Sequence, residues 1–185
     1  LSHILPESER SRGVAEIKRV LVARDYQEII TYSFVEPAWE IDFAGNAQPA
    51  ALLNPIASNM SVMRSGLIGG LIATLRSNLN RKQERVRIFE IGRCFLSQGA
   101  AVPTPEQQPL RLAALAYGLA QPEQWATAKT LVDFFDVKAD LAALVEGAVL
   151  TPAAHPALHP GRCAQVSVNG HTAGWLGELH PRLAQ

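Results

Sequence analysis

The chain has 185 residues, of which 48% are hydrophobic and 18% charged, and its seventeen Lys and Arg residues balance seventeen Asp and Glu residues. This length suffices for one domain with a real core, and an apolar chain without net charge is not intrinsically disordered. Because the net charge is zero, no overall electrostatic field attracts the chain to nucleic acid or to a membrane surface. Polar residues interrupt every apolar stretch before it reaches the ~18 residues that span a membrane. The start lacks the pattern of a signal peptide. Two cysteines, Cys94 and Cys163, form no disulfide framework and favour a reducing cytoplasm.

The first half of the chain predicts a helix, a strand and a second helix. Apolar residues at helical spacing predict a helix over residues 11–24, and the β-branched and aromatic residues 27–35 predict a strand. Residues 42–59 are rich in Asn, Gly and Pro and predict a loop. A continuous apolar stripe predicts a helix over residues 65–80, and the glycines Gly66 and Gly70 within it indicate close approach of another element.

The second half predicts mainly strands. Residues 85–96 alternate as a strand does, residues 97–109 form a surface excursion, and residues 112–119 predict a strand buried on both faces. Asp136 is the expected cap of a helix over residues 137–145, and residues 152–162 the expected rigid connection. The turn Asn169-Gly170 predicts a hairpin of residues 163–176. The sum is an α+β fold with a largely antiparallel sheet flanked by helices.

Histidines, cysteines and acids give no convincing catalytic or metal site. His155, His159 and Cys163 are four residues apart, but Pro156 and Pro160 prevent helical geometry and no further ligand pair completes a tetrahedron. We therefore interpret the three as part of a rigid turn and expect no metal ligands. Cys94 is expected to be a small core residue. The acids Asp133, Asp136 and Asp140 are interpreted as helix caps and solvated turn residues.

Two charged features are candidates for a role. Six basic residues lie within eighteen positions, a density that could meet RNA phosphates or an acidic partner, although a solvated helix end explains it equally well. They are Arg76, Arg81, Lys82, Arg85, Arg87 and Arg93, and the first four are the candidate contacts. The strand alternation also places Glu90 on the inward face, where a buried carboxylate needs Arg64 or Arg93 as a partner.

Several ordered segments resemble the beta subunit of bacterial phenylalanyl-tRNA synthetase. These segments are residues 54–67 (NPIASNMSVMRSGL), 78–81 (NLNR), 87–95 (RIFEIGRCF), 132–138 (VDFFDVK), 159–162 (HPGR) and 174–181 (GWLGELHP). The resemblance covers nearly the whole chain. It implies one class II synthetase-like core domain over residues 1–185, truncated at both ends relative to the full subunit.

The resemblance also implies that this core is not itself catalytic. Residues 16–24 and 26–34 look like the helix and strand of class II motif one, which builds subunit interfaces, and residues 86–96 look like the first strand of motif two. Motif two continues with an Arg that binds the α-phosphate of ATP and a Glu two residues further on. Leu96 and Gln98 stand at these positions, and a leucine cannot stabilise the charge of adenylate formation. The Gly-rich motif three is not found.

The function implied is a structural core that supports ATP-dependent attachment of phenylalanine to its tRNA. The implied partners are the catalytic alpha subunit, in an α2β2 heterotetramer, and tRNA(Phe), whereas DNA and membranes are not expected as partners. ATP and Mg2+ are implied as cofactors of the whole enzyme only, and the implied location is the cytoplasm. The helices of residues 65–80 and 16–24 are then expected to expose apolar area. Two alternatives stay open, a catalytic amino-acid:AMP ligase of class II type and an unrelated scaffold domain.

Overall fold

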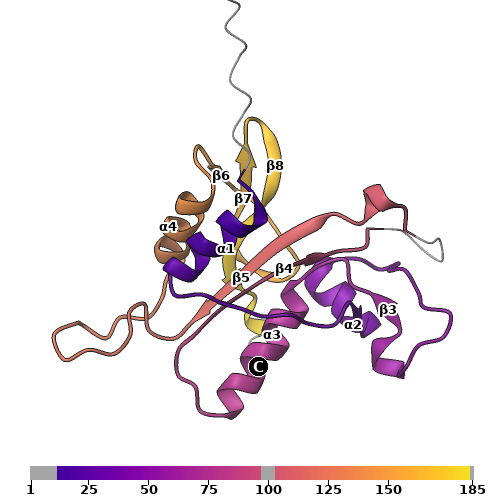
Figure 1. The fold of residues 1–185 in the computed structure, drawn as a ribbon, viewed down its shortest axis with the longest axis horizontal. Helices are drawn as coiled ribbons and strands as arrows, with labels where there is room; N and C mark the ends of the chain where they lie inside the picture. Colours follow the sequence, from indigo (N-terminus) through magenta and orange to yellow (C-terminus); the bar gives the residue numbers. More distant parts are fainter. Residues whose placement is uncertain (1–11, 97–102, 184–185) are drawn as a thin grey trace, which may run out of the picture.

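A computed structural model describes residues 12–96 and 103–183 (Figure 1). Its central sheet has the order β1-β4-β5, formed by Gln27–Glu28, Val86–Arg93 and Leu110–Tyr117. β1 runs parallel to β4, whereas β5 is antiparallel to it from the pair Val86↔Tyr117 to the pair Arg93↔Leu110. A second sheet, β6-β7-β8, is fully antiparallel and consists of Val149–Pro152, Leu158–Val168 and His171–Leu179.

Helices cover both faces of the central sheet because β4 alternates its side chains. Val86 and Ile88 point to α3 (Ile68–Asn80) and pack against Leu71 and Leu75. Phe89 points the other way and packs against Leu21 of α1 (Val14–Ala23), and α4 (Phe134–Leu144) adds Leu144 to this cluster. The predicted α+β architecture with antiparallel sheets and flanking helices is therefore confirmed.

The segment between β1 and α3 is more irregular than the strand predicted over residues 27–35. Only Gln27–Glu28 and Phe34–Val35 (β2) are strands, and β2 pairs with β3 (Val62–Met63). The chain leaves β4 after Ile29 because the Thr31 amide and hydroxyl both donate to the Glu90 carboxylate. After β2 come α2 (Pro37–Trp39) and the π-helix η1 (Glu40–Ala44), and the 3-10 helix η2 (Ser58–Met60) precedes β3.

Two further predictions about strands are wrong. The strand predicted over residues 112–119 is β5, but it lies at the sheet edge with Leu110 and Leu112 exposed, so it is not buried on both faces. The rigid connection predicted over residues 152–162 is shorter, because β7 begins at Leu158 and contains Pro160 and Gly161. The pairing of β7 with β8 is irregular between Leu158 and Cys163, and such an irregularity accommodates a proline that cannot donate to the ladder.

The local signals of the last helix and of the final hairpin had different outcomes. α4 is capped by Asp133, whose Oδ1 accepts the Phe135 and Asp136 amides, and Asp136 closes a capping box by accepting the Asp133 amide. The prediction of Asp136 as the cap was wrong by one helical turn. The hairpin prediction is confirmed, because Asn169 and Gly170 have φ of 50° and 80° between β7 and β8.

Short 3-10 helices occupy residues Pro105–Gln107 (η3), before β5, and Pro181–Leu183 (η4), at the last described positions. η4 lies close to α3, since Arg76 Nη2 is 3.4 Å from the Leu183 carbonyl. Within the two described ranges, no helix combines the length and the apolar character that crossing a bilayer requires.

Candidate functional site

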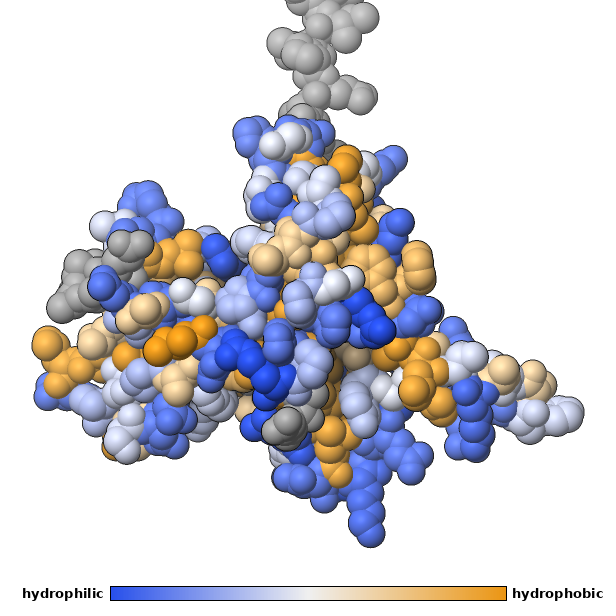
Figure 2. All heavy atoms as spheres, turned by 180° about the vertical axis from the view of Figure 1, so that it is seen from behind, coloured by the Kyte–Doolittle hydropathy of each residue, from blue (hydrophilic) through white to orange (hydrophobic). Residues whose placement is uncertain are grey.

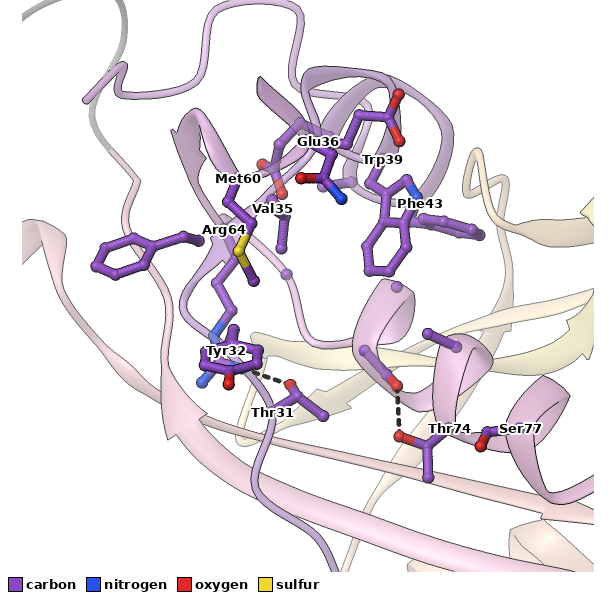
Figure 3. Close-up of a pocket in the computed structure, with 18 of the residues that line it drawn as sticks. Thr31, Tyr32, Val35, Glu36, Trp39, Phe43, Met60, Arg64, Thr74 and Ser77 are labelled. Atoms are coloured by element: carbon purple, nitrogen blue, oxygen red, sulfur yellow. Dashed lines mark hydrogen bonds between the residues drawn. The ribbon is translucent and has the colours of Figure 1, made fainter. Parts of the chain in front are cut away.

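A groove of about 490 Å³ lies between α3 and the segment that links β1 to η1 (Figure 3). One wall is the face of α3 that carries Gly69, Gly70, Ala73, Thr74, Ser77 and Asn78, with Gly66 before the helix and Arg81 at its end. The other wall is largely aromatic and includes Tyr32, Phe34, Trp39 and Phe43. Its size is typical of ligand-binding pockets and of the clefts that receive a side chain of a partner.

Small residues on α3 create the space in which the aromatic wall sits. A Cβ atom added at Gly69 would lie 2.8 Å from the Trp39 ring and 3.1 Å from the Phe43 ring. These two rings contact each other edge to face, with centroids 6.0 Å apart. An added Cβ at Gly70 would collide with the Thr31 side chain, whereas at Gly66 the nearest atom is the Ala44 Cβ at 3.5 Å. The close approach predicted from these two glycines is therefore present at Gly70, where Thr31 makes it, while α2 and η1 approach α3 at Gly69.

Arg64, which lines the groove, belongs to the charged pair that was predicted to lie in the interior. Arg64 Nη1 donates to Glu90 Oε1 at 2.7 Å and to the Thr31 hydroxyl at 3.0 Å, and both charged side chains are almost completely buried. Figure 3 shows the Arg64 side chain running down to Thr31 beneath Tyr32. Arg93, the other candidate partner of Glu90, instead donates to the Gln108 carbonyl at the surface.

Glu40 is a second buried acid at the groove, and no pattern in the sequence had indicated it. It is 3% exposed, and its Oε2 accepts both the amide and the hydroxyl of Ser65, just before α3 begins. Burial raises the pKa of Glu40, and the two hydrogen bonds from Ser65 oppose this shift. Because Glu40 and Arg64 are both held by protein groups, the groove is better suited to binding than to proton transfer.

Two of the residues that line the groove are large, apolar and exposed. Ile30 and Tyr32, both lining residues, are 89% and 73% exposed, and Ile41, Leu53 and Ile56 are exposed further along the chain. The prediction that α3 itself exposes apolar area is wrong, because its large apolar side chains are buried against β4. On α1, Val14 and Val22 are exposed. The surface seen from behind has separate apolar patches rather than one continuous field (Figure 2).

The six clustered basic residues do not form one patch. Arg81 and Lys82 are exposed at the end of α3, whereas Arg76 lies within α3 and donates to the Leu183 carbonyl. Arg85 forms an ion pair with Asp25 at 2.5 Å and Arg87 one with Asp140 at 3.1 Å. Arg85 and Arg87 therefore have structural partners, and the exposed residues among the predicted contacts are Arg76, Arg81 and Lys82.

Asp140 organises a polar network on the opposite side of the sheet. This acid on α4 accepts hydrogen bonds from Arg24, Arg87 and the Tyr26 hydroxyl, at 2.6, 3.1 and 2.7 Å. Burial and the Asp140 carboxylate raise the pKa of Tyr26, so the phenol remains a proton donor. The spacing of Asp133, Asp136 and Asp140 had predicted only caps and turns, and Asp140 is instead the residue that fastens α4 to α1 and β4.

The interpretation of His155, His159 and Cys163 as one rigid turn is wrong, because His159 and Cys163 lie in strand β7. The His155 and Trp175 rings contact each other in a tilted arrangement with centroids 5.1 Å apart, and His155 Nδ1 accepts the Ala157 amide, while His159 Nδ1 accepts the Gly161 amide. Cys163 is buried, and Cys94 is fully buried, which raises the pKa of both thiols. The described part of the chain has no group of three or more His, Cys, Asp or Glu residues arranged to hold a metal.

Leu96, the residue in place of the motif-two arginine, follows β4 and is 37% exposed, with its amide bonded to the Gln107 carbonyl at 2.8 Å. It is not among the residues that line the groove. Gln98 lies outside the described residues. The side chain at this position thus offers no positive charge.

Comparison with known proteins gives results that agree with this geometry. Residues 3–185 match the family described as the phenylalanyl tRNA synthetase beta chain CLM domain. The chain is 52% identical over its whole length to the phenylalanine--tRNA ligase beta subunit of Burkholderia pseudomallei (strain 1710b), and 52% identical over 98% of its length to that of Chromobacterium violaceum. It covers 24% and 23% of these relatives, so it spans about a quarter of their length.

A likeness among solved structures concerns the fold alone. The pyrrolysyl tRNA synthetase PylSc of Desulfitobacterium hafniense superimposes with a TM-score of 0.57 over 86% of this chain and 54% of that one, at 14% identity. The architecture is therefore that of a tRNA synthetase core, as the resemblance had implied.

Proposed function

Because the chain belongs to the family of phenylalanyl-tRNA synthetase beta chain CLM domains, we propose that it is one non-catalytic domain, over residues 1–185, that supports the attachment of phenylalanine to its tRNA. In this proposal the catalytic alpha subunit binds ATP, Mg2+ and phenylalanine, and the two kinds of subunit assemble as an α2β2 heterotetramer in the cytoplasm. The chain described here supplies a rigid surface against which the alpha subunit packs.

The observation that carries this proposal is the apolar rim of the groove. Ile30 and Tyr32 project to solvent while Thr31 between them is bonded to Glu90 in the interior. Exposed large apolar side chains on a segment that is bonded to the interior are typical of a subunit interface and unfavourable on a free surface. The uncharged Leu96 supports the non-catalytic role, because adenylate formation needs positive charge at that position.

The test is assembly of the full-length beta subunit with a tagged alpha subunit. Ile30→Arg places a charge at the rim of the groove, so we expect it to abolish co-purification and with it aminoacylation. Val149→Arg is the matched control, because Val149 is 58% exposed on β6, in the other sheet. If Ile30→Arg co-purifies as well as the control, the groove is not the interface.

We also propose that Arg81 and Lys82 contact tRNA(Phe) or the alpha subunit, since they are exposed at the end of α3 where the groove ends. Neutralising both by substitution with Gln is expected to raise the KM for tRNA and to reduce its salt dependence if the contact is with phosphates. An unchanged KM together with weaker subunit assembly would assign the pair to the protein interface instead.

A further inference from the structure

Residues 119–131, which we term the arm, leave the body of the protein as a narrow excursion. The arm is closed at its base by the bridge Leu119↔Leu131 and by the Ala120 amide on the Thr130 carbonyl at 2.9 Å. Every residue from 121 to 131 is exposed, and Trp125 near the tip is 102% exposed. Figure 1 shows the arm projecting from the end of β5, away from α3 and β6-β8.

The base of the arm is fixed to the sheet by two arginines. Arg85 Nε donates to the Leu119 carbonyl at 3.0 Å, and Arg87 Nη2 donates to the Ala120 carbonyl at 3.2 Å. Arg87 is itself held by Asp140 and lies over the Tyr26 ring at 5.3 Å. The direction in which the arm leaves the sheet is thus set by the packed core.

The composition of the arm indicates what it meets. Its only charged residues, Glu123 and Lys129, form an ion pair with each other, so the arm has no net charge. Binding of RNA draws on unpaired basic residues, and none is present on the arm. A large aromatic residue in an uncharged surround is instead typical of the anchor residues of protein interfaces.

We infer that the arm inserts Trp125 into an uncharged, apolar protein cleft on the alpha subunit, with an acceptor for the indole N–H. This inference rests on the proposed role in subunit assembly and adds a second contact away from the groove. A protein is favoured over RNA because the two charges of the arm, Glu123 and Lys129, are paired with each other, and the alpha subunit is the protein partner that the proposed function supplies.

The first experiment measures the accessibility of Trp125 in the whole enzyme. Hydroxyl-radical oxidation of Trp125 is compared between the assembled native enzyme and the same enzyme in denaturant. We expect oxidation at least about tenfold slower in the native enzyme. Equal rates would overturn the inference, and so would protection that appears only after tRNA is added, because that result would mean base stacking.

The second experiment identifies the chain that covers the indole and the contribution of that contact. A photo-crosslinking phenylalanine derivative at position 125 is expected to link to the alpha subunit, and a link within the beta polypeptide would overturn the inference. Trp125→Ala is expected to weaken assembly by about 30-fold, the scale of an anchor residue, while Thr127→Ala on the same arm leaves it unchanged. Equal behaviour of these two variants contradicts the inference even where Ile30→Arg confirms the groove.

Discussion

Removal of the Glu90 carboxylate is expected to destabilise the chain strongly. Glu90 is 1% exposed and accepts from Arg64 Nη1 at 2.7 Å, from the Thr31 hydroxyl at 2.7 Å and from the Thr31 amide at 3.3 Å. In Glu90→Ala the Arg64 guanidinium keeps its bonds to Thr31 and to the Arg93 carbonyl but becomes a buried charge without a counter-ion. Breaking such a pair costs about 3–5 kcal/mol.

At about 2–4 °C per kcal/mol for a domain of this size, the Tm should fall by about 6–20 °C. Urea unfolding followed by circular dichroism measures the same loss as a lower midpoint, with an unchanged slope if only stability changes. Glu178→Ala is the control, because Glu178 forms its ion pair with Arg162 at the surface, and exposed pairs contribute little. The double variant Glu90→Leu/Arg64→Met should regain part of the loss, since it removes both charges.

The reasoning is refuted if Glu90→Ala unfolds within a degree or two of the parent and resembles the surface control. It is also refuted if the double variant is less stable than Glu90→Ala by the full cost of a second independent substitution, because the two charges would then not be coupled.

Three other outcomes follow from the same structure. Asp133→Ala should lower the free energy of unfolding by about 1 kcal/mol in urea titration, because it removes the cap of α4, and Asp136→Ala should cost less. Burial lowers the pKa of His155. The contribution of this imidazole to stability is therefore complete above about pH 6.5, where the unfolded group is neutral, and is lost as the pH falls from there through the lower folded pKa. In His155→Asn, which keeps a turn acceptor but does not titrate, the urea midpoint should depend less on pH between pH 5 and pH 7.5. The chain should show no phenylalanine-dependent pyrophosphate exchange, and Leu96→Arg with Gln98→Glu should not create it, because one restored charge does not assemble a catalytic site; exchange by the parent chain would overturn the non-catalytic role.

Local periodicity predicted the elements whose two faces differ. The alternation of residues 86–91 correctly placed Val86 and Ile88 toward one helix and Glu90 inside, and the turn Asn169-Gly170 located the last hairpin. These signals are local, because side-chain direction in a strand and positive φ in a turn depend on neighbouring residues only. They suffice for the fold class.

Tertiary contacts decided what the sequence did not predict. The strand after β1 ends because Thr31 bonds to Glu90, 59 positions away, and no local pattern contains that bond. The six basic residues do not form one patch because β4 is extended. At about 3.3 Å per residue, Arg85 and Arg93 lie about 26 Å apart. The groove was missed because Trp39, Glu40 and Phe43 come from a three-residue helix and a π-helix without an apolar period.

The open edge of β5 has a consequence for the chain in isolation. β5 bonds to β4 along all eight residues, and within the described ranges no strand bonds to its other side. Its sequence from Leu110 to Tyr117 has no Pro or Gly and a single charge, Arg111, and such an unpaired edge is a template for intermolecular β-pairing and aggregation. At high concentration, two copies can therefore join their central sheets edge to edge through backbone hydrogen bonds. A lysine in place of the exposed Ala114, which faces away from α3, would obstruct this pairing and keep the isolated chain in solution.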